Sequence, residues 1–201
     1  MTVDVISGSA SIRSPFSLRC ATPGDAASLA ALASKTFSDT YRGLDDPQEI
    51  ADYVAEHFNL RVVRDVITNP AATTLLAEVG AVLAGYAVVT RTEPPACVEG
   101  SLAVELTRFY LAEQYIGRGF GAQLMLAVHR EARREGARTI WLGVYDRNVR
   151  AVDFYERWGF AKCGGKEFLF GGRLYIDPIY ASAVRDEGRP FACAGPLPDS
   201  T

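Results

Sequence analysis

The sequence has few of the residues that usually bind metals. Two histidines and four cysteines occur among 201 residues, and no Cys-x-x-Cys pair is present. Structural zinc sites draw on paired cysteines and histidines at short spacings. His57 and His129 lie far apart in helix-like segments, where we expect surface or packing roles. The sequence therefore predicts that this protein holds no metal.

Long apolar runs and an excess of positive charge are also absent. No uninterrupted apolar stretch reaches the roughly 20 residues that a membrane-spanning helix needs. Residues 1–15 lack the charged-then-apolar order of a secretion signal. The formal net charge is -3, which gives no reason to expect nucleic acid. These observations predict a cytoplasmic protein that binds neither membranes nor nucleic acid.

Length and composition favour one globular domain. A chain of this length in which 48% of residues are hydrophobic can bury a full core. Residues 1–15 are small and polar, and the C-terminal segment is rich in proline, glycine and alanine. We therefore predict a flexible segment over 1–15, a single domain over 16–183 and a flexible tail over 184–201.

Periodic patterns of apolar residues predict an alternation of strands and helices. Strand patterns cover residues 18–20, 73–78, 82–90, 102–111, 139–145, 160–170 and 173–180. Helical patterns cover residues 25–38, 47–58, 60–68, 122–136 and 148–158. The last two strands flank Gly171-Gly172, a typical hairpin turn.

The segment Tyr-Ile-Gly-Arg-Gly-Phe-Gly-Ala, residues 115–122, connects a predicted strand to a predicted helix. Glycines permit positive φ and close approach of the backbone to a ligand, and the free amides of a helix N-terminus attract anions. Arg118 adds a cation. The segment therefore predicts a phosphate-binding loop, with a tight turn that binds nothing as the alternative. Its spacing fits neither a P-loop nor a dinucleotide-binding fingerprint.

Two motifs, in order and at the right distance, carry a resemblance to a known family. The loop at Arg118-Gly119-Phe120-Gly121 is followed by the strand TIWLGVY and by the segment NVRAVDFYERWGF, residues 148–160. This order resembles the acetyl-CoA-binding core of the GNAT N-acetyltransferase superfamily, and is most similar to the bacterial diamine and polyamine N-acetyltransferases of the PaiA type. The match is close over residues 102–180 and extends over 18–90 in pattern only.

The resemblance implies a fold and a cosubstrate. The implied fold is α/β (α+β mixed), with a central, mostly antiparallel mixed sheet of six to seven strands, splayed at the acetyl-CoA site and flanked by helices. The implied cosubstrate is acetyl-CoA. Its binding residues would be Phe109, Tyr110, Leu111, Ile116, Gly117, Arg118, Gly119, Phe120, Gly121, Ala122, Asn148 and Arg150. Ile116 departs from the family, which usually has Gln or Arg at that position. Asn148 would also suit a helix cap, and Arg150 a solvated surface.

In acyl transfer to an amine, one proton must leave the amine and another must reach the departing thiolate. A lysine-like amine has a pKa near ~10.4 and is protonated at neutral pH, so a base must remove the proton. The resemblance implies Glu105 as that base and Tyr155 as the acid that protonates the departing thiolate. Backbone amides around residues 109–111 would stabilise the oxyanion if the strand bulges there. The alternatives are a strand-edge glutamate and a core tyrosine.

The acceptor is the least constrained part of the prediction. Seven carboxylates stand between residues 25 and 58: Asp25, Asp39, Asp45, Asp46, Glu49, Asp52 and Glu56. Together they would attract a cation, although a solvated acidic helix face explains them equally well. We therefore expect an N-acetyltransferase that acts by direct attack of a primary amine in a ternary complex, with a polyamine or another small cationic amine as candidate acceptor.

Two other functions fit the same fold. One is acetylation of a peptide or protein amine, and the other is a non-catalytic CoA-binding sensor. The aromatic residues of the C-terminal strands would suit either a homodimer or simple core packing.

Overall fold

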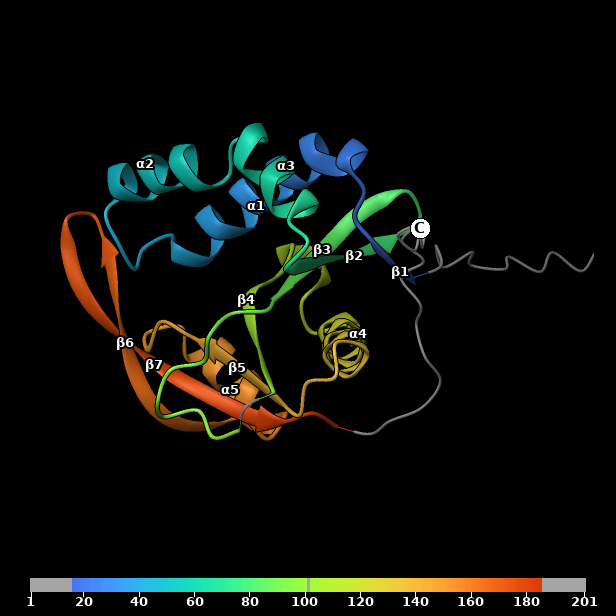
Figure 1. Cartoon of the computed structure of the whole chain (residues 1–201). Coiled ribbons are helices and arrows are strands. Elements are labelled where there is room, and N and C mark those ends of the chain that lie inside the picture. Colours follow the sequence, from blue (N-terminus) through green and yellow to red (C-terminus); the bar gives the residue numbers. More distant parts are fainter. Residues whose placement is uncertain (1–15, 101, 186–201) are drawn as a thin grey trace, which may run out of the picture.

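The computed structural model describes residues 16–100 and 102–185, and within them seven strands form one sheet in the order β1-β2-β3-β4-β5-β7-β6 (Figure 1). Neighbouring strands pair antiparallel except β4 and β5, which run parallel. The strand bounds are β1 (Phe16–Cys20), β2 (Ala72–Val79), β3 (Val82–Thr90), β4 (Ala103–Leu111), β5 (Thr139–Gly143), β6 (Ala161–Phe170) and β7 (Arg173–Ala183). The predicted mixed, mostly antiparallel sheet is confirmed.

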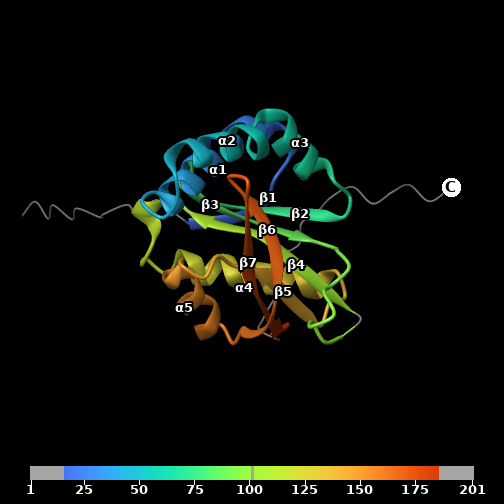
Figure 2. The ribbon, with the colours of Figure 1, turned by 90° about the vertical axis from the view of Figure 1, so that its left-hand side faces the viewer.

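Helices cover both faces of this sheet. One layer holds α1, α2 and α3, and the opposite layer holds α4 and α5 (Figures 1 and 2). The helix bounds are α1 (Ala26–Tyr41), α2 (Pro47–His57), α3 (Leu60–Thr68), α4 (Phe120–Arg134) and α5 (Val149–Arg157). Successive side chains of a strand point to opposite faces of the sheet, so β3 contributes residues to the cores on both sides. Ala87 and Val89 pack in the core under α4, whereas Tyr86 and Val88 pack in the core under α1 to α3.

Residues just before each helix explain where most of the helices begin. Asp46 caps α2 by accepting from the amides of Gln48 and Glu49, and Asn59 caps α3. Asn148 caps α5 by accepting from the amide of Ala151. In contrast, α4 has glycine at its N-cap and no side-chain cap. Its first amides are therefore left without intrahelical partners.

The sheet opens between its two parallel strands. β4 pairs with β5 only from Ala103 to Glu105, and from Leu106 onward it stays paired with β3 alone. The register with β3 slips at Thr107, which faces no partner residue, and its hydroxyl donates to Val88 O at 3.1 Å. The predicted splay is thus present. The bulge lies at Thr107 rather than at residues 109–111, where the sequence placed it.

A glycine keeps β3 close to β4 beside this opening. A Cβ on Gly85 would lie 2.6 Å from Tyr110 O and 3.3 Å from Leu111 Cα. Such contacts are too short for any side chain, so the two strands can approach this closely only because position 85 is glycine.

The β6–β7 hairpin extends beyond the rest of the sheet toward α2 (Figure 1). Gly171 and Gly172 have φ of 56° and 73°, as the tight two-residue turn requires. A Cβ on Gly171 would overlap the carboxylate of Glu49, so the turn lies directly against α2. The hairpin therefore forms a wall opposite β4, with α1 and α2 above it.

The predicted flexible segments fall almost entirely outside the described residues. Residues 1–15 and 186–201 are not described. The first two residues of the predicted tail are packed: Val184 N donates to Arg138 O, and the Arg185 guanidinium lies 5.0 Å from the Trp158 ring centroid. Among the described helices, none has the length and apolarity to cross a membrane.

Candidate active site

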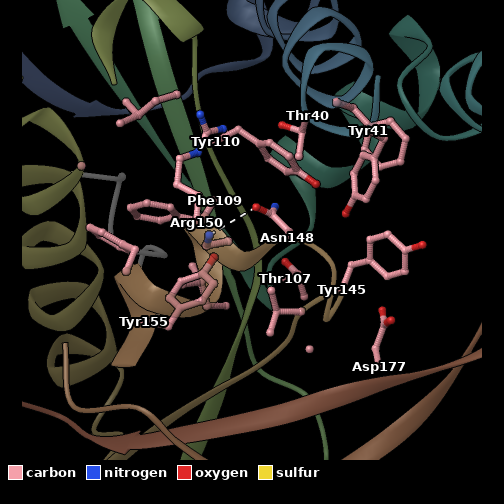
Figure 3. Close-up of a pocket in the computed structure, with 18 of the residues that line it drawn as sticks. Thr40, Tyr41, Thr107, Phe109, Tyr110, Tyr145, Asn148, Arg150, Tyr155 and Asp177 are labelled. Atoms are coloured by element: carbon pink, nitrogen blue, oxygen red, sulfur yellow. Dashed lines mark hydrogen bonds between the residues drawn. The ribbon is translucent and has the colours of Figure 1, made fainter. Parts of the chain in front are cut away.

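A cavity of about 520 Å³ runs from the glycine loop, through the opening between β4 and β5, to the β6–β7 hairpin (Figure 3). It combines residues from distant parts of the chain, because the loop, the sheet opening and the hairpin come together only in the fold. Eleven of the predicted site residues line it: Phe109, Tyr110, Leu111, Ile116, Gly117, Gly119, Gly121, Ala122, Asn148, Arg150 and Tyr155.

The glycine loop forms one end of the cavity and is shaped for an anion. Gly117 and Gly119 have φ of 78° and 85°, and an added Cβ would meet nothing within 4 Å at either position. Gly119 is the N-cap of α4, so the free amides of the first helical turn lie beside this open space. Free amides, the helix dipole and unfilled space together fit the diphosphate of a nucleotide-like ligand.

Tyr155 and Asn148 lie at the middle of the cavity. Tyr155 is 8% exposed and packs edge-on against Phe109, with ring centroids 6.3 Å apart. Burial raises the pKa of the Tyr155 phenol, so the group is protonated at neutral pH and can donate a proton. The Asn148 carbonyl oxygen accepts from Ala151 N at 3.2 Å, the dashed line in Figure 3. No described residue makes a hydrogen bond with the amide nitrogen of the Asn148 side chain.

Three predicted site residues do not line the cavity. The Glu105 carboxylate accepts from Lys166 Nζ at 3.0 Å and from Thr92 Oγ1 at 3.3 Å. Phe120 stacks on Phe16 of β1 with ring centroids 4.8 Å apart, so its side chain contributes to packing. Arg118 is exposed on the loop. Lys166 itself lines the cavity, so Glu105 is connected to the cavity through this lysine.

The far end of the cavity is a chamber of which the sequence predicted only Tyr110, as a cofactor-binding residue. Its walls carry rings from α1, α2, β4, the segment after β5 and the hairpin. We call it the aromatic chamber, lined by Phe37, Tyr41, Tyr53, Tyr110, Tyr145, Phe168, Phe170 and Tyr175. Each of these residues is typical of a buried core when taken alone. The alternation of Phe168 with Phe170 was the one local signal that a single face of the hairpin carries rings.

Two carboxylates also line this chamber. Asp45 accepts from the Tyr145 hydroxyl at 3.3 Å. Asp177 on β7 is 8% exposed, and burial raises the pKa of its carboxyl group.

The acidic N-terminal region therefore contributes less than its composition predicted. Of the seven carboxylates between residues 25 and 58, Asp45 is the one that lines this cavity. Asp25 is paired with Arg19, Asp39 with Lys35, and Asp46 caps α2. Asp177, far along the sequence, supplies the second negative charge.

Comparisons with known proteins agree with this geometry. The family model described as Acetyltransferase (GNAT) family matches residues 31–160. An uncharacterized N-acetyltransferase of Mycobacterium tuberculosis is 33% identical over 155 residues, which make up 77% of this chain and 95% of that protein. The spermine/spermidine N(1)-acetyltransferase of Bacillus subtilis is 32% identical over 66 residues, covering 32% of this chain and 43% of that protein.

Among solved structures, the PaiA N-acetyltransferase of Thermoplasma acidophilum in complex with coenzyme A has a TM-score of 0.68 and 20% identity, and the match covers 84% of this chain and 99% of that chain. At this level of identity the likeness concerns the fold.

Proposed function

Because the chain belongs to the GNAT family of acetyltransferases, we propose that it transfers an acetyl group from acetyl-CoA to a primary amine of a small cationic molecule, with polyamines as the candidate class. That it is an acetyl-CoA-dependent N-acetyltransferase follows from the family. The acceptor class is our inference. The observation that carries it is one continuous cavity with the glycine loop and the N-terminus of α4 at one end and two carboxylates among aromatic rings at the other.

Acetyl-CoA supplies the acetyl group as a thioester. The free amides beside Gly119 would hold its diphosphate, and Asn148 would donate from its amide nitrogen. Every second amide of β4 beyond Leu106 faces the gap left by β5, because antiparallel pairing with β3 uses only alternate amides. These amides would stabilise negative charge on the thioester oxygen during attack.

The proposed transfer is a direct attack with both substrates bound. The ammonium group of the acceptor gives a proton to Glu105, the predicted base; its nitrogen then forms a C–N bond with the acetyl carbon, and the C–S bond breaks. Tyr155 donates its phenolic proton to the leaving sulfur and regains a proton that the new amide nitrogen releases. The products are the N-acetylated amine and coenzyme A with a free thiol.

Glu105 remains our predicted base, and its removal is expected to lower kcat. For Glu105→Gln we expect kcat to fall about 100-fold, the range typical of a lost general base. The control is Glu135→Gln, because Glu135 is a similarly buried, ion-paired carboxylate whose partners, Arg91 and Arg134, do not line the cavity. The side chains of Glu105 and Glu135 are 12% and 16% exposed. An unchanged kcat in Glu105→Gln would leave Glu105 only the task of holding Lys166.

The cover that the hairpin turn gives to one side of the chamber favours a small acceptor over a peptide. The hairpin turn lies against α2 at Glu49, which covers that side of the chamber. A peptide would need an open groove there. The local similarity to the spermine/spermidine N(1)-acetyltransferase supports the polyamine class.

The direct test is release of free thiol from acetyl-CoA by the purified protein with a panel of acceptors. The panel contains spermidine, spermine, putrescine, an aminoglycoside, a lysine-containing peptide and an amino acid. We expect turnover with the polyamines and little with the peptide. Turnover with the peptide alone would favour a protein acetyltransferase. Coenzyme A binding without turnover on any amine would favour a sensor.

A further inference from the structure

Asp177 is a mostly buried carboxylate that contacts no cation directly in the part of the chain that the structure describes. Its side chain lines the aromatic chamber, and the residue is 8% exposed. Within residues 16–100 and 102–185, neither a hydrogen bond nor an ion pair within 4 Å reaches its carboxylate. Lys166 is its cross-strand partner, yet the Lys166 ammonium is bound to Glu105 at 3.0 Å and lies 5.2 Å from the Trp141 ring centroid. Burial raises the pKa of Asp177, and the positive charge of Lys166 opposes this rise through space, but the ammonium group itself is bound to Glu105.

The aromatic rings around Asp177 pack against one another. Tyr145 packs edge-on against Tyr175 with centroids 5.9 Å apart, and its other neighbour Tyr41 lies at the same centroid distance. Figure 3 shows the Asp177 carboxylate pointing toward Tyr145. Burial raises the pKa of Tyr41 and Tyr53, and the negative charge of Asp177 contributes to both shifts. The Asp177 carboxylate and the Tyr41 and Tyr53 phenols therefore line the same part of the cavity.

This combination suits a cation. A buried carboxylate without a partner is unfavourable, and an ammonium group that enters the chamber relieves that cost. Tyrosine faces attract ammonium ions and also pack against the methylene groups that carry them. A neutral polar group would satisfy the hydrogen bonds of the carboxylate but would bring no cation into contact with it.

We propose that Asp177 binds a second, non-reacting ammonium group of the acceptor, so that the preferred substrate is an aliphatic diamine or longer polyamine rather than a monoamine. This inference rests on the proposed function and adds the residue that selects the acceptor. The reacting nitrogen lies at the opening between β4 and β5, near Tyr155, while the second nitrogen lies among Asp177, Tyr145 and Tyr175. Asp177 is thus a specificity residue, distinct from the groups that move protons.

The test compares three amines of similar length: putrescine, 4-amino-1-butanol and butylamine. In the wild-type protein, kcat/KM for putrescine should exceed that for each of the other two at least about 30-fold, as expected when a buried charge is left unpaired. In Asp177→Asn the preference should fall to within about threefold, with putrescine losing most. The matched control is Glu167→Gln, which removes a carboxylate from the exposed face of the same hairpin and should keep the preference.

Calorimetry separates failure of this inference from failure of the proposed function. Putrescine is titrated into the coenzyme A complex of the wild-type protein and of Asp177→Asn. Binding that depends on Asp177 without turnover would overturn the acetyl transfer and support the diamine site. Turnover that is equal for putrescine and 4-amino-1-butanol in the wild-type protein would overturn the diamine site, whether or not the variant folds. Equal loss of activity on all three amines in Asp177→Asn would also overturn it, since that pattern assigns Asp177 to proton transfer.

Discussion

Gly119→Glu is expected to weaken coenzyme A binding at least ~100-fold, the largest effect on binding among these predictions. Gly119 has φ of 85° and is the N-cap of α4, where an added side chain enters the open space beside the free amides. Glutamate would occupy the space that we propose for the diphosphate of coenzyme A, and its negative charge would repel the phosphates. The measurement is isothermal titration of coenzyme A into the wild-type protein and the variant.

Gly136→Glu separates the effect on the ligand from the effect on the backbone. Gly136 follows the C-terminal end of α4 with φ of 74°, and an added Cβ there also meets nothing within 4 Å. Both substitutions place a non-glycine residue in the left-handed region, at a cost of roughly 1–2 kcal/mol in the free energy of unfolding. Only Gly119→Glu should lose coenzyme A. Wild-type affinity in Gly119→Glu would remove the loop from the binding site.

Tyr155→Phe is expected to lower kcat about 100-fold, with the dissociation constant of acetyl-CoA changed less than about twofold. The substitution keeps the ring that packs against Phe109 and Phe160 and removes only the proton donor. Steady-state kinetics with the best amine of the panel, together with calorimetric titration of acetyl-CoA, give the two quantities.

Tyr86→Phe is the matched control for the loss of a buried phenol. Tyr86 is 1% exposed, does not line the cavity, and its hydroxyl has no hydrogen-bond partner among the described residues. Removing that hydroxyl should leave kcat unchanged and cost no stability, because an unsatisfied polar group is lost. If Tyr155→Phe behaves in the same way, Tyr155 is a packing residue and another group protonates the thiolate.

The features that the sequence by itself determined are those that depend on neighbours in the chain. Asn148 caps α5, and Gly117 and Gly119 adopt positive φ, because a cap or a turn needs the right residue only within a few positions. The order of strands and helices follows from periodicity for the same reason. The end of the cavity that we propose for coenzyme A lies on one such local unit, a strand, a glycine loop and a helix, so residues that line it could be named in advance.

The tertiary structure alone decided the aromatic chamber, the end of the cavity that we propose for the acceptor. Tyr41, Tyr145 and Asp177 come from elements far apart in the sequence, and nothing in their local patterns says that they share a space. The register of β6 with β7 sets Lys166 opposite Asp177, and the fold then turns this lysine toward Glu105. Pairing of distant strands determines which charges meet, and such pairing depends on the whole packed core rather than on any segment of the chain.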